Sequence, residues 1–163
     1  MMSGTFAVRD HLLEELELSV RTSCTLIAQI QPTQWDFRPQ DNMRSLMELV
    51  HHLVAIPATD LAILQERTEQ EVAEVENGAA GITSPDELIQ RFQANLELFK
   101  QYILSLSEDE LLTKSSKAYY LEHGMVQVKW LIEVTTHTFH HRSQLYNYLK
   151  QNGHDLNFFM LYM

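Results

Sequence analysis

The histidines are the residues of this chain whose type and spacing point most directly to chemistry. The 163 residues include 8 histidines, and most of them cluster as His51 and His52 and as His137, His140 and His141. Each residue of an α-helix turns by about 100°, so His137 and His141 would lie only about 40° apart on one helix face. Two imidazoles one turn apart can share a single metal ion.

The choice of a third ligand falls between His51 and His52. On a helical wheel, His52 lies at the edge of the apolar arc, beside Leu49 and Ile56, whereas His51 faces the opposite side. A residue at the edge of the apolar arc can turn its side chain into the bundle. We therefore predict His52 as the third ligand.

The predicted site is a divalent-metal centre formed by His52, His137 and His141. His140 falls about 100° from its neighbour and is left out. Buried imidazoles need partners, and neutral imidazole is a common ligand for Zn, Ni, Cu and Fe. Three histidines leave coordination positions open, as in catalytic sites, whereas structural zinc sites are closed by four ligands. The alternative is that these are ordinary buried histidines and that the pair spaced by four arises by chance.

Two glutamates lie one helical turn before predicted ligands. Glu48 precedes His52 by four residues, and Glu133 precedes His137 by four. Each is a candidate catalytic residue, because it could accept the free ring N–H of its histidine or act as a general base. The alternative for each is an ordinary exposed pair on the helix surface.

Other side chains have weaker claims to a role. Tyr119, Tyr120 and Trp130 could wall a substrate pocket or simply pack in the core or a loop. Arg142 could hold an anionic substrate or form a surface salt bridge. Cys24 lies on an apolar stripe and is expected to be a small core residue.

Composition excludes several classes of function. The net charge of −10 opposes binding to nucleic acid or to an anionic membrane surface. A single cysteine allows no internal disulfide, residues 1–9 do not resemble a signal peptide, and no uninterrupted apolar run reaches the length of a membrane span. We expect one cytoplasmic domain covering residues 1–163.

Hydrophobic residues recurring at steps of three and four predict long helices. Ser45 with Glu48 forms a capping box, and Ser84 with Pro85 gives a second helix start. Asn152-Gly153 supplies a stop. The predicted helices cover residues 5–30, 45–64, 85–106 and 126–151.

The connections between these helices are expected to be irregular. Residues 32–44 should be an ordered connection whose aromatic residues fold back on the bundle, and the acidic tract 66–76 a solvated face leading into a flexible loop at 77–81. Residues 113–124 favour a loop or small hairpin. The apolar residues 156–163 should pack on the domain or on a second subunit.

Two segments resemble a known family. The run 137–145 (HTFHHRSQL) and the run 45–53 (SLMELVHHL) are similar to the HxxxHRGQ-like and LxELxxH-like segments of the DinB-like (DinB/YfiT-like, bacillithiol S-transferase-type) superfamily of metalloenzymes. One departure is Ser143, where the family usually has glycine. The resemblance implies an all-α, four-helix bundle of up-down-down-up topology, with Ni or Zn on His52, His137 and His141, and often a homodimer.

This resemblance favours an enzyme with a small-molecule substrate. Its metal would activate a low-molecular-weight thiol of bacillithiol type, as in a thiol S-transferase, or water, as in a metal-dependent hydrolase. Two other classes stay open. One is a metal-binding, stress-related protein without turnover, and the other is a metal-free helical module that dimerises through the apolar residues 158–162.

Overall fold

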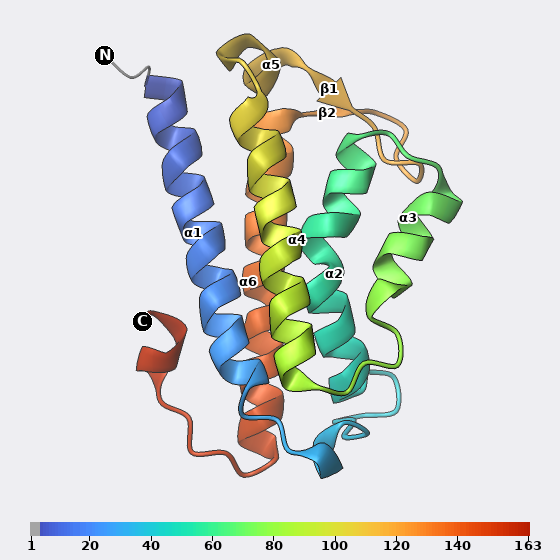
Figure 1. Cartoon of the computed structure of the whole chain (residues 1–163), viewed down its shortest axis with the longest axis vertical. Coiled ribbons are helices and arrows are strands. Elements are labelled where there is room, and N and C mark those ends of the chain that lie inside the picture. The colour runs from blue at the N-terminus through green and yellow to red at the C-terminus, as the bar shows by residue number, and fades with distance from the viewer. Residues whose placement is uncertain (1–3) are drawn as a thin grey trace.

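Four long helices form a bundle in this computed structural model, which describes residues 4–163 (Figure 1). The all-α fold and the four predicted helices are confirmed, although the first helix ends earlier than expected. Of the segment 1–9, where no signal peptide is expected, the first three residues lie outside the described part of the chain. The long helices are α1 (Gly4–Ile27), α2 (Leu46–Leu64), α4 (Pro85–Ser105) and α6 (Gln127–Gln151).

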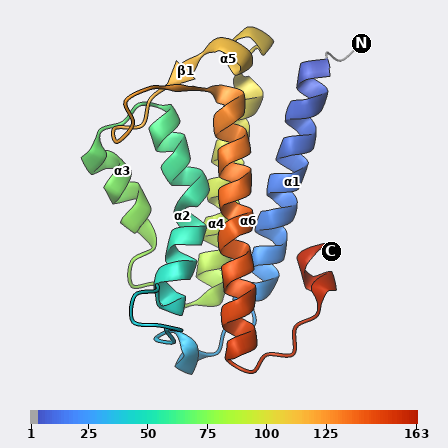
Figure 2. The same ribbon diagram turned by 180° about the vertical axis from the view of Figure 1, so that it is seen from behind.

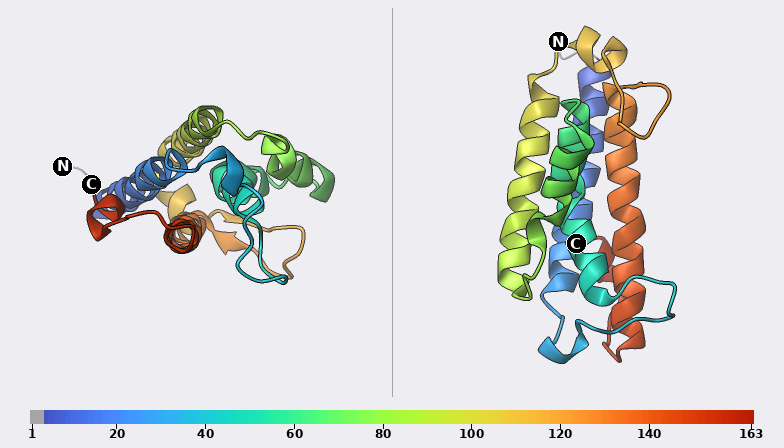
Figure 3. Two further views of the ribbon diagram at one scale, coloured as in Figure 1. Left: turned by 90° about the horizontal axis from the view of Figure 1, so that it is seen from below. Right: turned by 90° about the vertical axis from the view of Figure 1, so that its right-hand side faces the viewer.

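The order of helix directions is up-down-down-up. Helices α2 and α4 run in the same direction, while α1 and α6 run in the other (Figures 1 and 2). This is possible because α3 (Glu69–Glu76) returns the chain along the outside of the bundle before α4 begins. Viewed along the bundle, α1 and α2 each lie between α4 and α6 (Figure 3, left).

Short polar motifs fix where the helices begin. The Ser45 hydroxyl accepts the backbone N–H of Glu48 at 3.2 Å, and the Glu48 carboxylate accepts the backbone N–H of Ser45 at 2.7 Å. This is the capping box predicted for α2. Ser84 accepts the backbone N–H of Glu87 ahead of Pro85 in the same way. Each motif satisfies backbone donors that the first turn of a helix leaves free.

The acidic tract is more ordered than its composition predicts. Thr68 and Glu71 form another capping box, which starts α3, and Val72 is buried against α2. The following residues form a 3₁₀ turn, η2 (Asn77–Ala79), in which Ala79 is buried. The charged side chains of the tract are exposed, so the predicted solvated face is confirmed, but the tract forms a helix and the segment predicted as a flexible loop begins with a 3₁₀ turn. The capping residues were visible in the sequence, but Val72 and Val75 alone gave too weak a periodicity to predict a helix.

A small hairpin closes one end of the bundle. After the short helix α5 (Glu108–Thr113), β1 (Ser115–Ser116) pairs antiparallel with β2 (Met125–Val126). The Ser116 hydroxyl donates to the carbonyl of Leu64 at 2.9 Å, which ties the hairpin to the end of α2. This position of the hairpin places Tyr119 and Tyr120 beside α2.

The connection after α1 is ordered, as predicted, and includes the 3₁₀ turn η1 (Pro32–Gln34). Trp35 is buried, and the ring of Phe37 meets the ring of Tyr148 edge to face at 5.9 Å. These aromatic contacts hold the connection against α6. They therefore set the position from which α2 starts.

Helix α2 is the most apolar helix of the described chain. It is long and apolar enough to cross a membrane by length and composition, but 61% of the window that passes this test is buried inside the bundle. Contacts with α3, α4 and α6 surround it. Its apolar character therefore reflects its central place in the bundle.

The C-terminal residues fold back onto the domain. After η3 (Phe158–Leu161), the carbonyl of Leu161 accepts a hydrogen bond from the Arg142 guanidinium at 2.8 Å. Three aromatic side chains of this segment nevertheless remain at least half exposed: Phe158, Phe159 and Tyr162. The segment thus packs on its own domain and still presents an aromatic surface.

Candidate metal centre

His52, His137 and His141 come together between α2 and α6. The Nε2 atom of His137 lies 3.3 Å from Nε2 of His52 and 3.0 Å from Nε2 of His141. One ligand atom from each of the three lies within 4.8 Å of the others, a spacing that could hold a metal ion. The triad therefore has one nitrogen of each ring turned to a common point.

The outer nitrogens of His52 and His141 each face a side-chain oxygen. His52 Nδ1 lies 3.2 Å from Glu76 Oε1, and His141 Nδ1 lies 2.8 Å from Gln144 Oε1. Histidines that bind metals usually donate their second N–H to such acceptors, which fixes the tautomer and the ring orientation. This arrangement leaves the inner nitrogens of both rings as lone-pair donors.

The inner nitrogens cannot satisfy one another through hydrogen bonds. A neutral imidazole carries one N–H, and in His52 and His141 that proton belongs on Nδ1, opposite an oxygen that can only accept. Two lone pairs then face Nε2 of His137, which has at most one proton to share. A cation at the common point satisfies all three nitrogens, so these residues fit a divalent metal ion.

Burial keeps the three rings neutral. It lowers the pKa of His137 to about 4 and that of His141 to about 3, and the neighbouring imidazoles lower both pKa values further. Burial also lowers the pKa of His52, and Arg44 adds to that effect. Neutral imidazole is the form that binds a metal ion, so the triad is ready to bind one at neutral pH.

Glu48 does not take the position that its spacing predicted. Its carboxylate caps α2 and pairs with Arg38 at 3.0 Å, and these contacts lower its pKa. Glu76 of α3 contacts His52 instead. The spacing rule failed because Glu48 belongs to the first turn of α2, where backbone N–H groups compete for its oxygens.

The other clustered histidines lie outside the triad. His51 Nε2 lies 2.7 Å from the carbonyl of Ile82 and links α2 to the start of α4. His140 is exposed, and its Nε2 lies 3.2 Å from the amide nitrogen of Gln144. Gln144 can therefore accept from His141 while donating to His140, which orients the amide.

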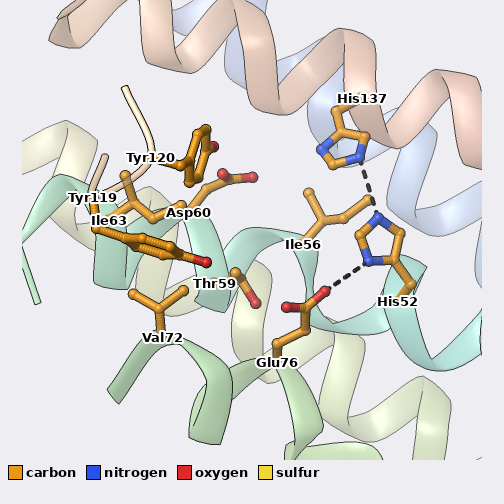
Figure 4. Close-up of a pocket in the computed structure, with 10 residues that line it drawn as sticks. All are labelled: His52, Ile56, Thr59, Asp60, Ile63, Val72, Glu76, Tyr119, Tyr120 and His137. Carbon is orange, nitrogen blue, oxygen red and sulfur yellow. Dashed lines mark hydrogen bonds and ion pairs between the residues drawn. The ribbon is translucent and has the colours of Figure 1, made fainter. Parts of the chain in front are cut away.

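A pocket opens beside the triad between α2, α3 and α6 (Figure 4). Its cavity volume is about 150 Å³. Tyr119 and Tyr120 cover one end of it, which agrees with the interpretation that they wall a pocket. Trp130 belongs to the core instead, where its ring N–H donates to the carbonyl of Ser116 at 3.1 Å. The lining residues are His52, Ile56, Thr59, Asp60, Ile63, Val72, Glu76, Tyr119, Tyr120 and His137.

Acidic groups surround this pocket. Ligand atoms of Asp60, Glu133 and His137 lie within 4.8 Å of one another. Burial raises the pKa of Asp60 well above its ordinary value, and the charges of Glu133 and Glu76 raise it further. Burial also raises the pKa of Glu133. The site therefore combines neutral imidazoles with carboxyl groups that hold protons more tightly than usual.

Asp60 and Glu76 are the site residues that sequence reasoning missed. Asp60 is an isolated acid in the apolar second half of α2, and this isolation is the signal that could have identified it. Glu76 gave no comparable signal. It is one of many acids in its tract, and only the path of α3 brings it to His52.

Arg142 and Cys24 serve the core. The Arg142 guanidinium donates to Thr22 Oγ1 at 2.9 Å and to Leu161, so it is neither a surface ion pair nor a group that lines the pocket. Cys24 is buried, and burial raises the pKa of its thiol to about 11. This confirms the prediction of a small core residue.

A three-histidine cluster within a four-helix bundle of this topology defines the class of protein, and the comparisons agree. The chain belongs to the DinB family, whose model matches residues 1–160. A search of curated proteins found no match.

Solved structures share the fold over most of the chain. A member of the DinB family from Exiguobacterium sibiricum is 28% identical, with a TM-score of 0.76, and the match covers 96% of this chain and 97% of the other. YfiT from Bacillus subtilis, described as a probable metal-dependent hydrolase with an unusual four-helix bundle topology, is 15% identical with a TM-score of 0.72, covering 94% and 91%. The colibactin self-resistance protein ClbS, solved in complex with double-stranded DNA, is 13% identical with a TM-score of 0.62, covering 86% and 95%.

Proposed function

We propose that His52, His137 and His141 bind one divalent ion, Zn or Ni, and that the chain is a metal-dependent enzyme acting on a small molecule. The observation that carries this proposal is the convergence of three Nε2 atoms, at 3.0 and 3.3 Å, with too few protons to satisfy them. Imidazole suits both metals, so the metal present at purification decides which one is found.

The ion would supply an activated nucleophile, because a divalent metal on three histidines lowers the pKa of a water or thiol in its open position toward neutrality. The chain's own residues would position this chemistry. Glu76 and Gln144 hold the rings of His52 and His141, and the pocket beside the triad holds the substrate against them.

Glu133 is the proposed general base. One of its oxygens is buried without a hydrogen-bond partner, and the other lies 3.8 Å from His137 Nδ1. Its raised pKa suits a group that takes a proton and returns it. Glu48, the other candidate, is engaged in capping α2, and we assign it no part in the reaction.

Thiol transfer is the reaction we propose first. The thiol proton would pass to Glu133, the sulfur would bond to an electrophilic carbon of the substrate, and the leaving group would depart with that proton. This preference rests on the resemblance to thiol S-transferases of the bacillithiol type. Hydrolysis is the alternative, and it is supported by the unpartnered oxygen of Glu133, which could equally accept a proton from water.

A protein that binds metal without turnover needs no substrate pocket, so the cavity beside the triad supports the enzyme over the stress-related binding protein. The same histidine geometry argues against a metal-free module. We also propose a homodimer, because Phe158, Phe159 and Tyr162 present an exposed aromatic surface. We also propose that the enzyme is cytoplasmic and does not bind nucleic acid, and the net charge of −10 supports the second of these proposals.

Elemental analysis of tag-free protein tests the metal site. We expect about one Zn or Ni per chain in the wild type and loss of the metal in His52→Ala and in His141→Ala. His11→Ala is the matched control, because it removes an exposed histidine of α1 that has no contact with the triad. A wild type that stays metal-free after incubation with Zn and with Ni would overturn the proposal. If the metal is present, assays of metal-dependent turnover with thiol-acceptor substrates and with ester substrates would distinguish thiol transfer from hydrolysis.

A further inference from the structure

The pocket beside the triad is lined by acidic side chains, with no basic side chain among its lining residues. Asp60 and Glu76 line it, Glu133 lies next to Asp60, and neither lysine nor arginine is present in the lining. Arg44 influences His52 but lines a separate surface hollow on the other side of that ring. An anionic group entering the pocket would meet carboxyl groups without a counter-charge.

Asp60 is the most deeply placed of these acids. Asp60 is only 6% exposed, and no described residue forms a hydrogen bond with its carboxyl group. Thr59 Oγ1 and Glu133 Oε2 are buried nearby and also lack partners. Buried polar groups are normally paired, so the unpartnered Thr59 Oγ1 in the lining and the unpartnered Glu133 Oε2 beside Asp60 indicate a missing ligand with positive or donor character.

The two tyrosines complete the cavity on its outer side. The rings of Tyr119 and Tyr120 meet at 90° with centroids 5.1 Å apart, and Figure 4 shows them on either side of the end nearest Asp60. Perpendicular aromatic rings are the walls of aromatic cages, which bind alkylated ammonium groups through cation–π attraction. Both tyrosines are about half exposed or more, so a ligand can reach them from solvent.

We propose that this pocket binds a compact organic cation, an alkylammonium group, at the end where the carboxyl group of Asp60 lies beside the rings of Tyr119 and Tyr120 (Figure 4). The cation would be part of the substrate, with the reacting atom on the side of His137; in this respect the inference rests on the proposed function. The cavity of about 150 Å³ limits the group to a small one.

The test uses a pair of probes that differ only in charge. Choline and its neutral carbon analogue 3,3-dimethylbutan-1-ol have the same shape and the same hydroxyl group, and the quaternary nitrogen of choline cannot coordinate a metal. Binding of each is measured by NMR titration in the metal-free and zinc-loaded protein. We expect a preference for choline of about tenfold in the wild type.

Two variants locate that preference. Asp60→Asn keeps the size of the side chain and removes its charge, so the preference should fall to about twofold or less. Asp41→Asn is the matched control, because Asp41 is exposed on a loop and lines no described pocket, and it should keep the wild-type preference. Tyr119→Leu alters the exposed rim without touching the buried acid, and it should also weaken choline binding.

Other outcomes would overturn the inference. These are equal binding of the two probes, an unchanged preference in Asp60→Asn, or a second zinc equivalent that excludes choline and is lost in Asp60→Asn. The last result would assign the acids to a metal ion. Metal content is measured on the same samples, so a chain that prefers choline but binds no metal would refute the proposed enzyme and leave the cation pocket standing.

Discussion

Nδ1 of His137 lies 3.8 Å from a carboxylate oxygen of Glu133, one turn earlier on α6, and neither this nitrogen nor the other oxygen of Glu133 has a hydrogen-bond partner. This distance is too long for a hydrogen bond. His52 and His141 already have acceptors within 3.2 Å for their outer nitrogens. His137 is therefore the ring whose orientation is least fixed before a metal binds.

Substitution of Glu133 should separate its two roles. Glu133→Ala removes the carboxylate nearest to Nδ1 of His137, the group that we expect to accept this N–H once a metal fixes the ring, and it should weaken zinc binding by about tenfold or more. Glu133→Gln keeps an acceptor oxygen, so zinc binding should stay near the wild-type level while turnover falls by about 100-fold, because an amide cannot act as a base. A chelating dye that competes for zinc gives the affinity, and full activity in Glu133→Gln would exclude the base role.

Glu76 and Glu48 should differ sharply in their effects on the metal. Glu76→Ala removes the acceptor for His52 and should weaken zinc binding by about tenfold. Glu48→Ala removes a helix cap and should lower the melting temperature slightly while leaving zinc binding unchanged. Both changes remove one exposed or half-exposed acid, so each serves as the control for the other. The reverse pattern would restore the assignment that the spacing suggested.

The metal-free protein should lose stability in acid. Unfolded histidines have a pKa near 6.5, whereas the folded values are about 4 for His137 and about 3 for His141. Between pH 6.5 and these lower values the unfolded chain binds more protons than the folded chain. The stability that the two neutral histidines contribute is therefore fully present above pH 6.5 and is lost as the pH falls toward the folded pKa values.

This effect can be isolated by comparing wild type with His141→Gln after removal of metal. Urea unfolding at pH 7.5 and at pH 5 should show a larger loss for the wild type. Asp60 and Glu133 have raised pKa values and change stability in the opposite direction, but they are present in both proteins. Equal losses in the two proteins would mean that His141 is not buried in neutral form.

Arg142 should control the C-terminal segment without affecting the metal. Arg142→Ala removes buried hydrogen bonds to Thr22 and Leu161 and should cost about 2 kcal/mol of unfolding free energy. Faster hydrogen exchange in residues 158–162, with unchanged zinc content, is the expected result. Loss of zinc in this variant would instead place Arg142 in the site.

Cys24 should be inert in the folded protein. Its thiol is buried with a pKa of about 11, so almost no thiolate exists at pH 8. Iodoacetamide followed by mass spectrometry should find no alkylation in the native protein and complete alkylation in urea. Rapid labelling of native protein would reveal an opening of α1 that the structure does not show.

The long helices and the histidine triad could be predicted because both depend on local periodicity. The spacing of His137 and His141 fixes their relative direction on α6 whatever the rest of the chain does, whereas His52 lies only at the edge of the apolar arc of α2, and the family resemblance supported its choice. Capping residues such as Ser45 and Ser84 mark helix starts for the same local reason. Such features need no knowledge of the tertiary fold.

The partners of the triad could not be predicted because they depend on long-range contacts. Glu76 reaches His52 only because α3 runs back along α2, and the hairpin brings Tyr119 to the same place. Asp60 can be recognised in the sequence as an isolated acid, but its place in the site depends on its proximity to Glu133 of α6. Arg142 was misread for a similar reason, since its partners are Thr22 and Leu161, which are distant in sequence.

The pocket is built from two kinds of element with different evolutionary freedom. The triad lies on α2 and α6, whose packing fixes the core, whereas Glu76, Val72 and the two tyrosines lie on α3 and the β1–β2 connection. Connections tolerate substitutions and insertions that core helices do not. Exchange of the β1–β2 connection can therefore change the rim of the pocket while the three histidines and the helices that position them stay the same.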